Sequence, residues 1–141
     1  MNKNGVINII EDDADDQFVL EEVSKQLRFL NKRIYFPDGY AALQYLSSPS
    51  EPTFLILSDI NSPRLKNLEL RSKLKKNAAT ALKCVPYLYF TTAGNHRHII
   101  GAYCESAQGF SIKLSEYHEI KDLSELIIKY WMASTAVIIV A

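Results

Sequence analysis

Four groups of polar residues in this chain each follow an apolar run directly. They are Glu11-Asp12-Asp13, Asp59, Thr91 and Lys113. A carboxylate is a competent nucleophile toward phosphorus, and its attack gives an aspartyl phosphate. Carboxylates packed together repel one another, and Mg²⁺, which binds a few carboxylates, waters and phosphate oxygens, relieves that repulsion. A cation, a lysine and a hydroxyl donor can together neutralise the oxygens of a transferring phosphoryl group.

The apolar runs that precede these groups have the composition of strands. Phe54-Leu55-Ile56-Leu57-Ser58, before Asp59, is typical of a central strand buried on both faces. We predict five strands, at residues 6–10, 33–36, 54–59, 85–90 and 110–112, and five helices, at residues 13–30, 40–47, 67–77, 96–105 and 116–131. This alternation predicts an α/β fold with a parallel sheet and helices on both faces. The carboxyl ends of parallel strands lie at one edge, where the polar groups can converge.

Apolar spacing predicts the buried face of each helix. Asp13 is a candidate cap of the first helix, with Asp15 and Asp16 in its first turn. The residues predicted to face the core are Val19, Val23, Leu27 and Leu30 in the first helix, Ala42, Leu43 and Leu46 in the second, and Ile120, Leu123, Leu126, Ile127 and Tyr130 in the last.

The composition limits the classes of protein. The 141 residues are 48% hydrophobic and 23% charged, which predicts one globular domain with a full core. Lys plus Arg number 16 and Asp plus Glu number 16, and this balance argues against a domain that binds nucleic-acid backbone. Cys84 and Cys104 match neither metal-site nor disulfide spacing, so we expect reduced thiols in the cytoplasm. No signal peptide is visible, and residues 127–141, which are apolar apart from Lys129, are fewer than the roughly 20 of a membrane-spanning helix.

The order and spacing of Glu11-Asp12, Asp59 with Pro63, Thr91 and Lys113 resemble the receiver domain of two-component response regulators. The resemblance covers residues 6–130. It implies a flavodoxin-like (βα)5 fold with the strand order 2-1-3-4-5. It divides the chain into a receiver domain at residues 1–132 and an apolar tail at residues 133–141.

The resemblance also implies a role for each matching residue. Asp59 would be the phospho-acceptor and a Mg²⁺ ligand, with Asp12 as a direct ligand and Glu11 acting through a water. The remaining roles are Asn61 as a backbone-carbonyl ligand, Thr91 as hydrogen-bond donor to the phosphoryl group, Lys113 as its ion partner, and Phe110 as the switch residue. We therefore expect a cytoplasmic signalling domain that is phosphorylated by a histidine kinase or phosphotransfer protein. It would act by changing its protein partner, without turning over external substrates and without binding nucleic acid or membrane.

Two positions depart from the receiver pattern. Leu114 stands where a proline with a preceding cis peptide bond usually follows the lysine, and Ser62 replaces an apolar residue before Pro63. A cis bond before a residue other than proline costs about 2.5 to 4 kcal/mol. A trans bond would displace Lys113 slightly, but neither change removes a reacting group.

Two alternative functions stay open. Asp13-Ala14-Asp15 fits the D-x-D nucleophile motif of haloacid-dehalogenase-like phosphatases, although two acids precede it and no cap domain or late paired-Asp motif is visible. The other alternative is a receiver-like interaction module that is never phosphorylated. Leu114 favours this module, and the intact set of acids, threonine and lysine opposes it.

The tail after the last helix is apolar. Ala136-Val137-Ile138-Ile139-Val140 is uncharged and rich in β-branched residues, a composition typical of a strand. Because such a segment would be prone to aggregation when exposed, we expect it to be covered. It would pack beside the last helix or pair with a second copy in a homodimer. The alternative is a helix that continues past Trp131.

Overall fold

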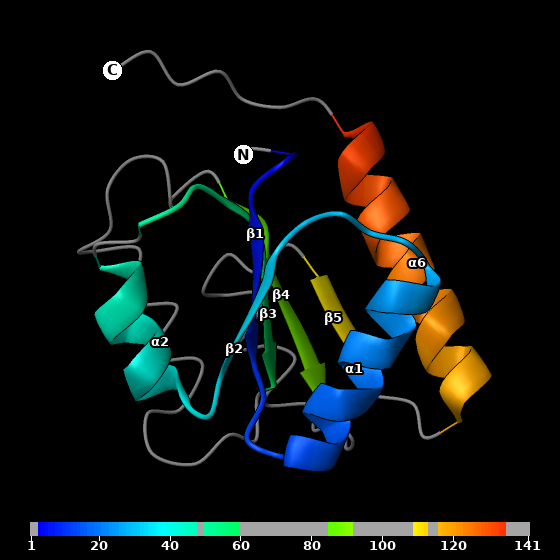
Figure 1. The fold of residues 1–141 in the computed structure, drawn as a ribbon, viewed down its shortest axis with the longest axis horizontal. Helices are drawn as coiled ribbons and strands as arrows, with labels where there is room; N and C mark the ends of the chain where they lie inside the picture. The colour runs from blue at the N-terminus through cyan, green and yellow to red at the C-terminus, as the bar shows by residue number, and fades with distance from the viewer. Residues whose placement is uncertain (1–2, 48–49, 60–84, 92–108, 113–115, 135–141) are drawn as a thin grey trace.

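Five parallel strands form one sheet in the order β2-β1-β3-β4-β5 (Figure 1). The strands are β1 (Val6–Ile10), β2 (Arg33–Phe36), β3 (Thr53–Asp59), β4 (Tyr87–Thr91) and β5 (Gly109–Ile112). The computed structural model describes residues 3–47, 50–59, 85–91, 109–112 and 116–134, with only the backbone described at residues 91 and 109–112. The predicted α/β class and the strand order 2-1-3-4-5 are confirmed.

Helices cover both faces of the sheet. Helices α1 (Ala14–Gln26) and α6 (Tyr117–Ala133) lie side by side on one face, and α2 (Gly39–Leu46) lies on the other (Figure 1). Ala42 and Leu46 of α2 are buried against the sheet and Leu43 packs beside them, as predicted. The helices predicted at residues 67–77 and 96–105 lie outside the described residues.

The first residues of β1 and β3 set the alignment of these two strands. Val6 pairs with Thr53 and Ile7 with Leu55, so Phe54 is an extra residue in β3. Gly5 packs against this irregularity, where a Cβ atom would lie 2.8 Å from the carbonyl oxygen of Pro52. A glycine is therefore required for the close approach of the two backbones. Beyond this point the pairing is regular, and it ends with Ile10 opposite Ser58.

Helix α1 ends earlier than predicted, and the prediction that Leu30 faces the core is wrong. Arg28 has a φ of 59°, and the N–H of Phe29 donates to the carbonyl of Ser24 over 3.3 Å. This left-handed turn stops the helix and directs Phe29 toward the core cluster on the α1 and α6 side. Leu30 then lies outside the helical periodicity and is 97% exposed, whereas Val23 is fully buried as predicted.

The buried face of α6 differs from the predicted face at two residues. Ile127, Ile128 and Trp131 contact the core cluster, but Leu126 and Tyr130 are exposed. At 100° per residue, a face centred between Ile127 and Trp131 leaves Leu126 and Tyr130 on the flank that points to solvent. No helix within the described parts of the chain is both long and apolar enough to cross a membrane.

An ion pair ties α1 to β2. The guanidinium of Arg33 donates to both carboxylate oxygens of Glu21 over 2.6 and 2.9 Å, and the hydroxyl of Tyr35 donates to the same carboxylate over 3.0 Å. The hydrogen bond from Arg33 lowers the pKa of Glu21 below its ordinary value of 4.5, against the opposing effect of burial. Burial in turn raises the pKa of Tyr35, so its hydroxyl stays a donor at neutral pH.

We predict that Glu21→Gln destabilises the fold at pH 7 by about 1–3 kcal/mol, because a charge-assisted bidentate bond is lost. Since the pKa of Glu21 is lowered in the folded state, its contribution is present above pH 4.5 and is lost as the pH falls through the folded value. The difference between the variant and the wild type should therefore shrink in acid. Urea unfolding measured at pH 7 and at several values below 4.5 tests this prediction.

Glu22→Gln is the matched control. Glu22 contacts Lys25 over 3.7 Å on the exposed side of the same helix, and such surface pairs contribute about 0–1 kcal/mol. The prediction is wrong if both variants lose equal stability, or if the deficit of Glu21→Gln does not change with pH.

Candidate functional site

Three carboxylates meet at the carboxyl ends of β1 and β3. Glu11 and Asp12 follow β1, and Asp59 is the last residue of β3. One oxygen from each of the three side chains lies within 4.8 Å of the others. The pairing of Ile10 with Ser58 brings them together, because the next position along these strands holds Glu11 and Asp59.

Glu11 is held in place from several directions. Its side chain is fully buried, and its carboxylate accepts the N–H of Asp13 over 3.1 Å. Its backbone N–H donates to Phe36 over 3.0 Å, and its carbonyl accepts from the amide of Gln17 over 2.6 Å. Gln17 is a positioning residue that the sequence analysis missed, because a glutamine in the first turns of a helix has no distinctive pattern.

The other two acids differ in exposure. Asp59 is 6% exposed between its neighbouring strands, whereas Asp12 is exposed to solvent. The group therefore has a buried side formed by Glu11 and Asp59 and an open side at Asp12. Water molecules and a ligand oxygen can reach the site from that open side.

Asp13 caps α1, as its position in the sequence predicted. Its carboxylate accepts the N–H of Asp15 over 2.8 Å and the N–H of Asp16 over 3.3 Å. It is not a member of the group formed by Glu11, Asp12 and Asp59. The cap geometry thus explains Asp13 without a catalytic role, which weakens the phosphatase alternative.

The donor set fits a hard divalent cation. All three side chains offer carboxylate oxygens, the ligands that Mg²⁺ and Mn²⁺ prefer in octahedral sites. Mg²⁺ keeps several waters and binds through few carboxylates, which agrees with a group that is buried on one side and open on the other. The predicted Mg²⁺ cofactor is therefore compatible with the residues present.

The ends of β4 and β5 lie along the same edge. Asp59 pairs with Phe90, so Thr91 lies one position beyond it, and Ile112 of β5 pairs with Thr91. Phe110 pairs with Tyr89 further inside the sheet. Only the backbone is described at Thr91 and Phe110, so their predicted roles stay predictions. Asn61 and Lys113, together with Ser62, Cys84, Cys104 and Leu114, lie outside the described residues.

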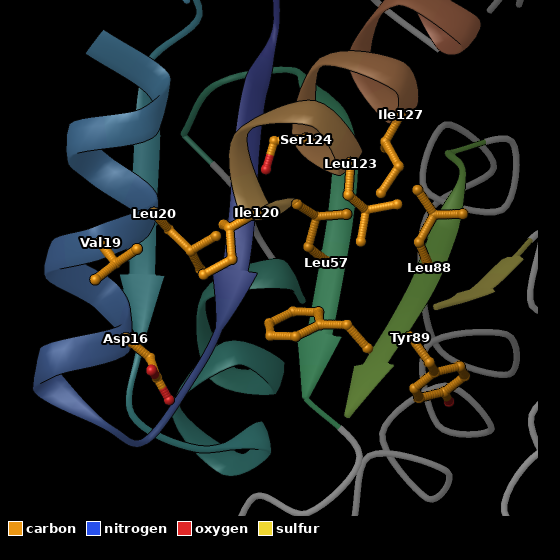
Figure 2. A pocket seen from close by; sticks show the side chains of 11 residues that line it. Asp16, Val19, Leu20, Leu57, Leu88, Tyr89, Ile120, Leu123, Ser124 and Ile127 are labelled. Atoms are coloured by element: carbon orange, nitrogen blue, oxygen red, sulfur yellow. The ribbon is translucent and has the colours of Figure 1, made fainter. Parts of the chain in front are cut away.

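A separate apolar cavity of about 70 Å³ lies between α1, α6 and the sheet (Figure 2). Leu20, Leu57, Leu88 and Ile127 contribute to its walls, and Asp16 lies at the edge toward the carboxyl ends of the strands. Its lining is almost entirely apolar, with no cluster of carboxylates or bases. Among the described residues, the candidate site for phosphoryl chemistry is therefore the carboxylate group at the ends of β1 and β3.

The chain is similar in sequence and in structure to response regulators. It is 29% identical over 132 residues to response regulator Rcp1 of Synechocystis sp., covering 89% of this chain and 86% of that protein. The Mn²⁺-bound form of response regulator Rcp1 superposes with a TM-score of 0.79 at 25% identity, covering 95% of this chain and 99% of that chain. The phosphorylated cyanobacterial phytochrome response regulator RcpA superposes with a TM-score of 0.82 at 22% identity, covering 93% and 96%. No protein-family model matches the chain.

The sheet order, the acids at the ends of β1 and β3 and these similarities are those of a response-regulator receiver domain. The similar Rcp1 structure contains bound Mn²⁺, and in this chain Glu11, Asp12 and Asp59 form a group that could hold such an ion.

We predict that Mg²⁺ raises the melting temperature of the wild-type protein, because it binds the three carboxylates only when folding brings them together. At ten times the dissociation constant the gain is about 1.4 kcal/mol, which corresponds to a shift of a few degrees. Asp12→Ala should lose most of this shift. Without Mg²⁺ this variant should melt no lower than the wild type, because one repelling charge is gone.

Asp15→Ala serves as the control, because Asp15 is an exposed acid of α1 outside the group. It should keep the full Mg²⁺ shift in thermal melting. An unshifted wild type, or an equal shift in Asp12→Ala, would contradict the proposed metal site.

Proposed function

We propose that this receiver domain accepts a phosphoryl group from a histidine kinase or phosphotransfer protein onto Asp59 in a Mg²⁺-dependent reaction. The observation that carries the proposal is the meeting of Glu11, Asp12 and Asp59 at the ends of β1 and β3. Asp59 is the acceptor in this proposal because it ends the central strand and is held between β1 and β4. A nucleophile fixed in this way is already oriented for in-line attack.

The transfer needs no separate general base. One oxygen of the Asp59 carboxylate attacks phosphorus as the P–N bond of a donor phosphohistidine breaks, and the electron pair of that bond stays on the imidazole nitrogen, which takes up a proton. A carboxylate attacks without first losing a proton, so the work of the site is orientation and charge neutralisation. Bound Mg²⁺ would supply positive charge to the phosphoryl oxygens, held by Asp12 and Asp59, by Glu11 through a water and by the backbone carbonyl of Asn61.

Thr91 and Lys113 complete the proposed site. The hydroxyl of Thr91 would donate a hydrogen bond to a phosphoryl oxygen, and the ammonium of Lys113 would pair with another. The backbone of β4 supports the first assignment, because Thr91 lies one position past the partner of Asp59. Hydrolysis of the acyl phosphate by water would return the Asp59 carboxylate. The chain would thus catalyse only its own phosphorylation and dephosphorylation.

The output in this proposal is a change of protein partner in the cytoplasm. A histidine kinase phosphorylates its partner where ATP is available, which supports that location. Phosphorylation adds negative charge and acceptor oxygens at the ends of β3 and β4. Movement of Thr91 toward the phosphoryl group would leave space for Phe110 of β5, and so alter the surface near β5 and α6.

We predict that incubation with Mg²⁺ and acetyl phosphate adds the mass of one phosphoryl group to the wild type, in a form that hydroxylamine removes. Asp59→Asn should reduce this labelling to background, because the amide cannot form an acyl phosphate. Intact mass and peptide mapping provide the measurement.

Asp13→Asn is the control for the phosphatase alternative. Its side-chain oxygen can still cap α1, so the fold and the labelling should be retained. Labelling that persists in Asp59→Asn but disappears in Asp13→Asn would support the phosphatase. A wild type that takes up no phosphoryl group from any donor would support an interaction module that is never phosphorylated.

We also predict where the signal is read. Beryllofluoride, a phosphoryl mimic, should change amide hydrogen exchange mainly at residues 92–114, because the coupling is expected to run from Thr91 to Phe110. Thr91→Ala should reduce this response while Mg²⁺ still shifts the melting temperature. Changes confined to α1 would contradict the prediction.

A further inference from the structure

Asp12 is the exposed acid of the candidate metal site. Glu11 and Asp59 are buried, whereas the side chain of Asp12 faces solvent. Packing does not enclose an exposed carboxylate, so the direction of its Cα–Cβ bond depends on the backbone that carries it. The two peptide groups on either side of Asp12 therefore determine whether its oxygens face the other two acids.

Hydrogen bonds hold both of these peptide groups. The carbonyl of Glu11 belongs to the peptide group before Asp12, and it accepts the side-chain amide of Gln17 over 2.6 Å. The N–H of Asp13 belongs to the peptide group after Asp12, and it donates to the carboxylate of Glu11 over 3.1 Å. Because each peptide group is planar, these two bonds fix the backbone on both sides of Asp12.

Helix α1 holds Gln17 in place for its contact with Glu11. The backbone N–H of Gln17 donates to the carbonyl of Asp13 over 3.0 Å, so the helical hydrogen bonds begin at the residue that caps α1. The side chain of Gln17 is half-buried. The link from β1 to α1 is thus closed by a side chain of α1, and the peptide group before Asp12 is tied to the helix.

We propose that Gln17 positions Asp12 as well as Glu11, and that it thereby determines how tightly the three acids bind Mg²⁺. This inference rests on the metal site of the proposed function. Removal of a group that orients a metal ligand typically weakens metal binding by about 10- to 100-fold. Mg²⁺ requires near-ideal octahedral geometry, whereas Ca²⁺ accepts a flexible one. A less firmly held Asp12 should therefore weaken the binding of Mg²⁺ more than that of Ca²⁺.

Gln17→Met tests the inference, because methionine keeps the length and the helix propensity of glutamine but has no N–H to donate. Isothermal calorimetry with Mg²⁺ alone and with Ca²⁺ alone measures the two dissociation constants. We expect the Kd for Mg²⁺ to rise about 10- to 100-fold and the Kd for Ca²⁺ to rise less, so the preference for Mg²⁺ should fall. Circular dichroism without metal should show a folded variant.

Gln17→Asn is the second variant, because it keeps the amide on a side chain that is one methylene shorter. It should show the same loss of preference for Mg²⁺. Gln44→Met is the matched control, since Gln44 is an exposed glutamine of α2, which lies on the other face of the sheet (Figure 1). It should leave both dissociation constants unchanged.

Two results would overturn the role of Gln17 alone. They are wild-type dissociation constants in Gln17→Met, and an equal loss of affinity for Mg²⁺ and Ca²⁺, which would indicate a general disturbance of the fold. Asp12→Ala separates these results from failure of the metal site. If Asp12→Ala binds Mg²⁺ as the wild type does, the metal site is wrong, and the role of Gln17 is wrong with it.

Discussion

The parallel alignment of β1 with β3 is the constraint on which the site depends. Ile10 lies opposite Ser58, so Glu11 and Asp59 leave the sheet as neighbours. A shift of one residue would turn the side chain of Asp59 to the other face of the sheet. The alignment is fixed at the far end of the strands, where Gly5 permits close backbone contact and Asn8 donates to the hydroxyl of Thr53 over 3.1 Å. Packing about five residues away therefore determines whether the carboxylates meet.

The strands could be predicted because burial on both faces leaves a strong signal in the sequence, whereas their order came from the resemblance to receiver domains. In a chain of this size, an apolar run such as residues 54–57 is best explained as a strand buried on both faces. The capping role of Asp13 could also be predicted, because the acids that follow it interact favourably with the N-terminal end of a helix dipole. The convergence of Glu11, Asp12 and Asp59 followed from topology, since parallel strands end at one edge.

The wrong predictions concern the burial of single side chains. In one case a local turn decided which residues are buried, and in the other the choice was between two apolar faces of one helix. Leu30 fits the period of α1, but the helix ends at Gln26, four residues earlier, and Arg28 after it adopts a left-handed conformation. In α6, apolar residues occupy more than half of the circumference, so periodicity alone could not separate Ile128, which is buried, from Leu126, which is exposed. The alignment of β1 with β3 and the support that Gln17 gives to Glu11 depend on tertiary contacts and have no sequence pattern.

The unequal burial of the acids gives the proposed metal site a closed side and an open side. Glu11 and Asp59 are closed off by the neighbouring strands, and Asp12 is exposed. A bound cation would offset the repulsion between these two carboxylates. The open side at Asp12 leaves room for the waters and phosphate oxygens that complete an octahedral shell. Among the described residues, Asp15 and Phe18 of the N-terminal part of α1 are exposed near this open side.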